Sequence, residues 1–119
     1  MSQIKLNIVT KTQKYPIYIG KKLSANISQI TKSNLINFNR CFLVVDSNVP
    51  RKFISIIKKS LKNKISYIHY FKANELNKNM NSTNKILEIL LNKNFSRDDC
   101  LISIGGGITG DISGFAASL

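Results

Sequence analysis

Residues 3–9 and 15–19 alternate apolar and polar side chains. A period of two predicts strands with one face towards water, and two such neighbouring strands can pair as a hairpin. Gly20 ends the second strand. Apolar residues then recur at helical spacing to about residue 31: Leu23, Ile27 and Ile30.

The pattern changes at residues 41–46, where CFLVVD is continuously apolar before its final Asp. Such a run is typical of a strand covered on both faces within a parallel sheet. We expect a helix after it, with Asn48 as its cap and Pro50 in its first turn. The apolar stripe expected on that helix consists of Phe53, Ile56, Ile57 and Leu61.

Two more strand and helix pairs complete the chain. Residues 65–70 and 101–104 are predicted strands, and a helix capped by Asn81 or Ser82 runs between them to about Asn92. Its inward positions are Ile86, Leu87, Ile89 and Leu90. Strands that alternate with helices predict an α/β fold: a Rossmann-like parallel sheet flanked by helices and preceded by the β-hairpin. We expect one domain over residues 1–119.

Length and composition agree with one globular domain that stays in the cytoplasm. The chain has 119 residues, of which 43% are hydrophobic. It contains no apolar run of the ~20 residues that a membrane span requires. Its beginning, MSQIKLNIVT, has no secretory-signal layout. Cys41 and Cys100 each open an apolar run, which favours buried free thiols over a disulfide.

A net charge of +12 is the usual sign of a nucleic-acid or anionic partner. All but three of the 18 basic residues are lysines, however, and they are scattered along the chain. The densest cluster, around Lys58 to Lys64, has no interleaved aromatic residues on which bases would stack. We therefore expect neither a nucleic-acid nor a membrane partner.

A glycine-rich turn follows the last predicted strand. Residues 105–110, GGGITG, satisfy the pattern GxGxxG between a strand and a helix. There, bare backbone N–H groups and the positive end of the helix can receive a phosphate. A tight turn that only packs the helix against the strand is the structural alternative. Asp111 either interacts with the helix dipole or accepts hydrogen bonds from a ligand.

Ligand-type side chains also follow the two earlier strands. Asp46 and Asn48 end the first, where an acid can hold ribose hydroxyls or simply form a turn. Glu75 and Lys78 follow the second, where an ordinary surface pair is the alternative. Because ligands of such sheets bind at the carboxyl ends of the strands, these positions together predict a nucleotide-binding domain.

The segment SIGGGITGDISGFAAS resembles the glycine-rich block of the 3-dehydroquinate synthase family, which reads roughly GGGxxGDxxGFxAS. The order of the remaining features is also similar to that family: YPIYIG in the opening strands, a strand ending in DSN, and a Glu and Lys three apart. The resemblance covers the whole chain. It implies NAD as cofactor, contacted by Asp46, Asn48, Glu75, Lys78, Gly106, Gly107, Ile108, Gly110 and Asp111.

One position departs from the family pattern. The family commonly has Gly before the glutamate, and here Asn74 precedes Glu75. Asn tolerates a left-handed backbone better than most residues, so we expect the turn to survive.

The resemblance further implies an activity. The family converts the seven-carbon sugar phosphate 3-deoxy-D-arabino-heptulosonate 7-phosphate to 3-dehydroquinate and phosphate, in the shikimate pathway. In full-length members a divalent metal, zinc or cobalt, is held by a glutamate and two histidines of a helical C-terminal domain. The only histidine here, His69, lies on a predicted strand without an acidic neighbour and is interpreted as a packing residue. No catalytic or metal-binding residue is therefore assigned.

The chain is accordingly interpreted as the front of such an enzyme, inactive by itself, and as one part of a full-length protein that can form a homodimer. Leu119 lacks a helix-stop signal, which favours an interruption before the helical domain. Two alternatives remain: another sugar-phosphate cyclase, or a truncated non-catalytic remnant.

Overall fold

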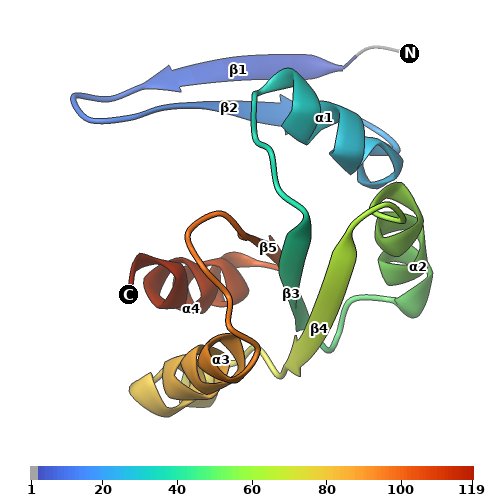
Figure 1. The fold of residues 1–119 in the computed structure, drawn as a ribbon. Coiled ribbons are helices and arrows are strands. Elements are labelled where there is room, and N and C mark those ends of the chain that lie inside the picture. Colours follow the sequence, from blue (N-terminus) through green and yellow to red (C-terminus); the bar gives the residue numbers. More distant parts are fainter. Residues whose placement is uncertain (1–2) are drawn as a thin grey trace.

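The computed structural model describes residues 3–119. Two strands form a hairpin, β1 (Ile4–Val9) and β2 (Lys14–Ile19), and three form a parallel sheet, β3 (Arg40–Asp46), β4 (Ile65–Phe71) and β5 (Cys100–Ile104). The helices are α1 (Ile27–Ser33), α2 (Arg51–Ser60), α3 (Met80–Asn92) and α4 (Gly107–Ser118). Short 3₁₀ helices, η1 (Leu23–Asn26) and η2 (Glu75–Asn77), precede α1 and α3. The predicted α/β class is confirmed (Figure 1).

The sheet has the order β4-β3-β5, so the apolar strand β3 is central. Its residues Cys41 to Val45 are almost entirely inaccessible to solvent, as the continuous apolar run predicts. Side chains of alternating residues enter two cores. Leu43 and Val45 pack with α2, whereas Phe42 and Val44 pack with α3 and α4. Helices therefore cover both faces of the sheet.

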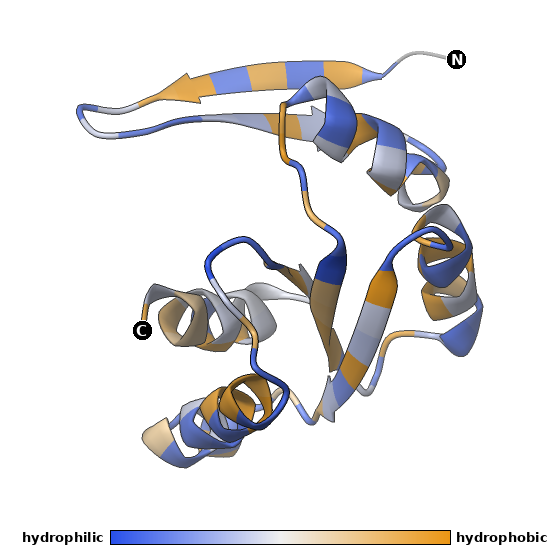
Figure 2. Cartoon of the chain, viewed as in Figure 1, coloured by the Kyte–Doolittle hydropathy of each residue, from blue (hydrophilic) through white to orange (hydrophobic). Residues whose placement is uncertain are grey.

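The hairpin lies apart from this sheet, next to α1 (Figure 1). Its strands show the predicted alternation (Figure 2), and Tyr18 accepts a hydrogen bond from Asn34, the residue after α1, at 2.9 Å. The prediction that only one face is wet is wrong for the described residues. The apolar face is also exposed, since between 39% and 53% of each of Ile4, Leu6, Ile17 and Ile19 is accessible to solvent.

Several helix details differ from the prediction. Pro50, not Asn48, is the N-cap of α2, without a side-chain cap. Helix α3 is capped by Asn79, whose side chain accepts from the Ser82 N–H at 3.0 Å. Asn79 precedes the helix directly, so its short side chain reaches the third amide.

The buried stripe of α2 also differs from the prediction. Ile54, Ile57 and Leu61 point inward, while Phe53 and Ile56 are exposed. The apolar residues of this segment cover two neighbouring stripes of the helix surface. Only the stripe that packs on the sheet is buried.

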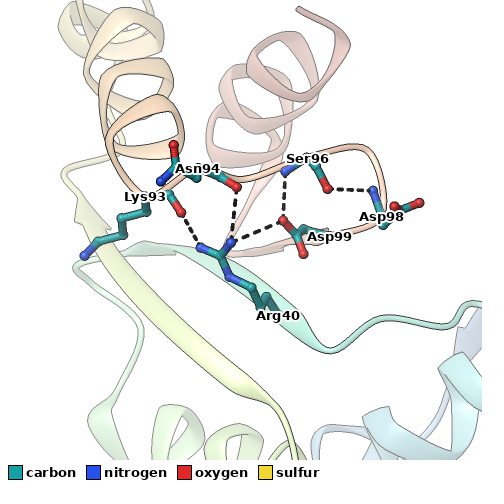
Figure 3. Close-up of polar contacts among 6 residues, drawn as sticks. All are labelled: Arg40, Lys93, Asn94, Ser96, Asp98 and Asp99. Atoms are coloured by element: carbon teal, nitrogen blue, oxygen red, sulfur yellow. Dashed lines mark hydrogen bonds and ion pairs between the residues drawn. The ribbon is translucent and has the colours of Figure 1, made fainter.

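Arg40 joins the amino ends of the sheet to the end of α3 (Figure 3). Its guanidinium donates to the carbonyl oxygens of Lys93 and Asn94, lies 3.8 Å from Asp99, and is 4.3 Å from the Phe95 ring centroid. A cation at these free carbonyls complements the negative end of the helix.

We expect Arg40→Ala to lower the free energy of unfolding by about 2 kcal/mol, because charge-assisted hydrogen bonds and two cation–π contacts, with Phe95 and Tyr67, are lost. Urea denaturation measures the change. The exposed Arg97→Ala is the matched control and should stay within about 0.5 kcal/mol of the parent. Equal effects of the two substitutions would contradict the role assigned to Arg40.

Cys41 and Cys100 are in-register neighbours on β3 and β5, and both are free thiols. Burial, with a smaller contribution from the neighbouring Cys100, raises the pKa of Cys41 to about 11. Burial also raises the pKa of the Cys100 thiol. Both groups are therefore protonated at neutral pH.

This shift predicts a pH dependence of stability. In the unfolded chain the Cys41 thiol has a pKa near 9. The raised pKa in the folded chain therefore makes a contribution to stability that is fully present below pH 9 and is lost as the pH rises towards 11. We expect Cys41→Val, which removes the thiol, to show a smaller loss of unfolding free energy between pH 8 and 10.5 than the parent. Denaturation curves at the two pH values measure this difference, and parallel losses would contradict it.

Candidate functional site

The carboxyl ends of β3 and β5 meet at a reversal of the fold. Beyond β3 the chain passes to α2 on one face of the sheet, and beyond β5 it passes to α4 on the other face. Neighbouring strands whose connections leave in opposite directions open a crevice at their carboxyl ends, which is where α/β sheets bind ligands.

Gly105 brings these two strand ends into close contact. Its φ is +152°, and a Cβ added to it would lie 2.8 Å from Thr109 Oγ1 and 2.9 Å from Asp46 Cβ. Glycine is required here by backbone conformation and space. Thr109 is fully buried, and its hydroxyl has no hydrogen-bond partner in the described part of the chain.

The next glycines have the opposite surroundings. A Cβ added to Gly106, Gly107 or Gly110 would meet nothing within 4 Å. Gly106 is the N-cap of α4 and provides no side-chain cap, so the first backbone N–H groups of the helix point outward without a partner from within the helix. The loop is therefore open to an incoming anion.

Asp46 and Asn48 form the turn after β3. The Asp46 carboxylate accepts from the Asn48 N–H at 3.0 Å, and the Ser47 N–H donates to the Phe71 carbonyl at 2.9 Å. The second bond fastens this turn to the end of β4. Since Asp46 also touches Gly105, the predicted residues of the first and third strand ends lie together.

The loop after β4 reaches the same edge through Lys78. Its ammonium lies 3.2 Å from an Asp111 carboxylate oxygen, and both side chains are well exposed. Asp111 lies on the second turn of α4, whereas the expected interaction with the helix dipole is strongest in the first turn. Glu75 is exposed on the same loop, in η2. Its carbonyl oxygen accepts a hydrogen bond from the Lys78 N–H at 3.2 Å, which closes the turn between these two predicted residues.

The expectation for Asn74 is wrong in its mechanism. Asn74 has φ −152°, an extended conformation, and its side chain accepts from the Asn77 N–H at 2.9 Å to cap η2. The loop thus needs an Asx-type cap at this position and not a left-handed residue.

His69 is a packing residue of β4, two positions before the carboxyl end of the strand. Its ring stacks with Phe42 at a centroid distance of 6.3 Å, and burial together with the nearby Lys85 lowers its pKa. Among residues 3–119, no three His, Cys, Asp or Glu side chains are grouped as metal ligands. No helix in the same range is both long and apolar enough to cross a bilayer.

Comparison with known proteins identifies the family. Residues 68–119 match the family model "3-dehydroquinate synthase N-terminal". Over 118 residues, the chain is 52% identical to the 3-dehydroquinate synthase of Pelagibacter ubique, covering 99% of this chain and 32% of that protein. The chain therefore belongs to the 3-dehydroquinate synthase family, as its N-terminal part.

Other relatives carry the same name. The 3-dehydroquinate synthase of Buchnera aphidicola is 40% identical over 88% of this chain and 29% of its own length. The 3-dehydroquinate synthase of Streptococcus sanguinis is 33% identical over 97% of this chain and 33% of its own length. The chain spans about a third of the length of these synthases.

A solved structure has the same fold. It is a 2-deoxy-scyllo-inosose synthase complexed with carbaglucose-6-phosphate, NAD+ and Co2+, with a TM-score of 0.83 and 19% identity. The match covers 98% of this chain and 32% of that one.

Sequence reasoning missed two features of this edge. Gly105 belonged to the motif but not to the predicted ligand contacts, and its packing role needs the tertiary structure to be seen. Arg51, the first residue of α2, lies 3.9 Å from the ring centroid of Tyr70 near the end of β4. The one sequence feature that could have drawn attention to Arg51 is that two cations, Arg51 and Lys52, occupy the start of a helix, where the helix dipole disfavours positive charge.

Proposed function

We propose that this chain is the NAD-binding part of a 3-dehydroquinate synthase. The observation that carries the proposal is the open glycine loop at the switch point between β3 and β5. Gly106 and Gly107 leave free space where a side chain would stand. Gly106 is the N-cap of α4 and Gly107 is its first residue. This arrangement suits the negatively charged pyrophosphate of a dinucleotide.

The surrounding side chains suit the rest of that cofactor. Asp46 offers an acceptor for ribose hydroxyls, next to the loop, and Asn48 lies in the same turn. The Lys78–Asp111 ion pair lies at the second turn of α4, where it can exchange its mutual contact for contacts with the ligand. Ile108 and Gly110 complete the first turn. Glu75 is assigned on the family resemblance and its place on the Lys78 loop.

In the complete enzyme, the reaction would convert 3-deoxy-D-arabino-heptulosonate 7-phosphate to 3-dehydroquinate with release of phosphate. Bound NAD would supply a reversible hydride acceptor. The residues described here would hold and orient it, while the divalent metal, zinc or cobalt, and the sugar phosphate would be held by residues outside this chain. By itself, the chain is proposed to bind cofactor without turnover.

Calorimetric titration of the 119-residue chain with NAD tests the proposal. We expect saturable binding with one site per chain, and circular dichroism of the same sample establishes that it is folded. A folded sample that gives no heat on titration with NAD would overturn the proposal and favour a non-catalytic remnant.

The choice of synthase rests on the relatives. The three 3-dehydroquinate synthases named above are 33–52% identical to this chain, whereas the 2-deoxy-scyllo-inosose synthase is 19% identical and indicates the fold alone. Another sugar-phosphate cyclase remains the second candidate. Fusing residues 1–119 to the remaining two-thirds of the Pelagibacter synthase and assaying phosphate release from the heptulosonate phosphate tests whether this part supports that reaction.

A further inference from the structure

Cys41 and Cys100 lie directly opposite each other on the neighbouring strands β3 and β5. They are the two cysteines of the chain, and both are free thiols. We propose that they are a redox-active pair, which closes to a disulfide when small-molecule disulfides accumulate and reopens when thiols prevail. The inference is independent of the proposed cofactor, because it rests only on the central sheet.

The geometry of a parallel sheet allows this bond. Neighbouring strands lie about 4.8 Å apart, within the range of about 4.4–6.8 Å over which a disulfide joins two Cα atoms. Cys41 belongs to the core on the α2 side, and Cys100 packs against the same core, so both thiols lie on one face of the sheet. After burial, the neighbouring Cys100 is the next cause of the raised pKa of Cys41, which agrees with two nearby sulfur atoms.

The other in-register pairs on this face have a different character. They consist of branched aliphatic side chains, Leu43 with Ile102 and Val45 with Ile104. Only the pair nearest the amino ends of the two strands consists of two cysteines. The chain therefore places both of its thiols where one bond can form, and no third cysteine competes for either of them.

The same geometry makes the bond easy to reduce. A disulfide prefers a Cβ separation of about 3.8 Å, which is about 1 Å less than the spacing of the strands. Closing the bond must therefore draw β3 and β5 together at their amino ends, against the packing of the core. Strained disulfides are more easily reduced than structural ones and serve as labile or regulatory bonds. The pair is thus suited to reversible closure.

Exposure sets the order of the two exchange steps. Cys41 is inaccessible to solvent, whereas Cys100 is partly exposed on β5, which is an edge strand among the described residues. Cys100 gives its proton to water, and its thiolate attacks one sulfur of a small-molecule disulfide, which releases one thiolate. Cys41 gives its proton to that thiolate and attacks the Cys100 sulfur, which releases the second. Two protein thiols are oxidised, and one small-molecule disulfide is reduced to two thiols.

Incubation of the folded chain with oxidised glutathione tests the proposal. It is carried out at about pH 8.5, because thiolates are the reactive form and burial raises the pKa of both thiols. We expect mass spectrometry to show the loss of two hydrogens without retained glutathione, and peptide mapping to join Cys41 to Cys100. Since the bond closes a long loop in the unfolded chain, the melting temperature should rise by about 5 °C or more. Excess reduced glutathione should reverse both changes.

Two variants separate the exchange steps. Cys41→Val removes the second thiol, so we expect it to retain one glutathione on Cys100. Cys100→Ser should stay unmodified while folded, because Cys41 is inaccessible to solvent. Neither variant should show the rise in melting temperature on oxidation that the parent shows.

Several results on the parent alone would overturn the proposal. These are a glutathione that stays on Cys100, thiols that both remain free, a bond that forms only in urea, or a bond that joins two chains. A Cys41–Cys100 disulfide that excess reduced glutathione leaves intact would equally contradict the reversible role.

Discussion

Gly106→Ala is expected to weaken NAD binding about a hundredfold while the chain stays folded. An added Cβ meets no atom of the chain within 4 Å, and the φ of −89° is accessible to alanine. The methyl group would instead stand where the pyrophosphate approaches. Loss of two charge-assisted hydrogen bonds amounts to about 3 kcal/mol, or about a hundredfold in affinity.

Calorimetry measures the affinity for NAD, and thermal denaturation measures the stability of the fold. Because alanine is a poorer N-cap than glycine, a stability loss of up to about 1 kcal/mol is expected. Gly114→Ala is the matched control: it lies on the same helix, is equally open, and should gain about 0.5–1 kcal/mol without affecting NAD. Unchanged affinity in Gly106→Ala would leave the open loop without a ligand role.

Gly105→Val should have the opposite consequence, a loss of fold. The residue has φ +152°, and its Cβ would collide with Thr109 and with Asp46 Cβ. Backbone strain and overpacking each cost about 1–3 kcal/mol, so we expect a loss of about 3 kcal/mol or more in unfolding free energy. NAD binding would fall in proportion to the unfolded fraction.

Urea denaturation followed by circular dichroism measures this loss. Gly20→Ala provides the comparison, because its Cβ would make ordinary contacts of 3.5–3.7 Å with Gln3. We expect it to unfold near the parent midpoint. A Gly105→Val protein as stable as the parent would show that the contact between β5 and Asp46 is not needed for the fold.

Much of the fold was predictable because its signals are local. The unbroken apolar run of β3 requires burial on both faces, and strands alternating with helical stripes leave few arrangements other than a parallel sheet. Helix beginnings were less predictable. Asn48, Asn79, Asn81 and Ser82 are all acceptable caps, and the choice among them depends on where the loop enters the helix.

The candidate site divides in the same way. Its residues were identifiable from the motif and from their positions after strands, but their grouping was not. The Lys78–Asp111 pair joins residues of two different loops, and the Arg51–Tyr70 pair joins a helix beginning to a strand end. Such pairs are separated along the chain, so no periodicity in the sequence reports them.

By itself, the amino-acid sequence determined the succession of elements, the burial of β3 on both faces and the glycine loop, because hydrophobic period and backbone freedom act over a few neighbouring residues. Only the tertiary structure decided that Gly105 serves packing while Gly106 faces open space, that the hairpin's apolar side stays uncovered among residues 3–119, and that an arginine meets a tyrosine at the sheet edge. These outcomes depend on which distant segments meet, and that follows from packing the whole chain at once.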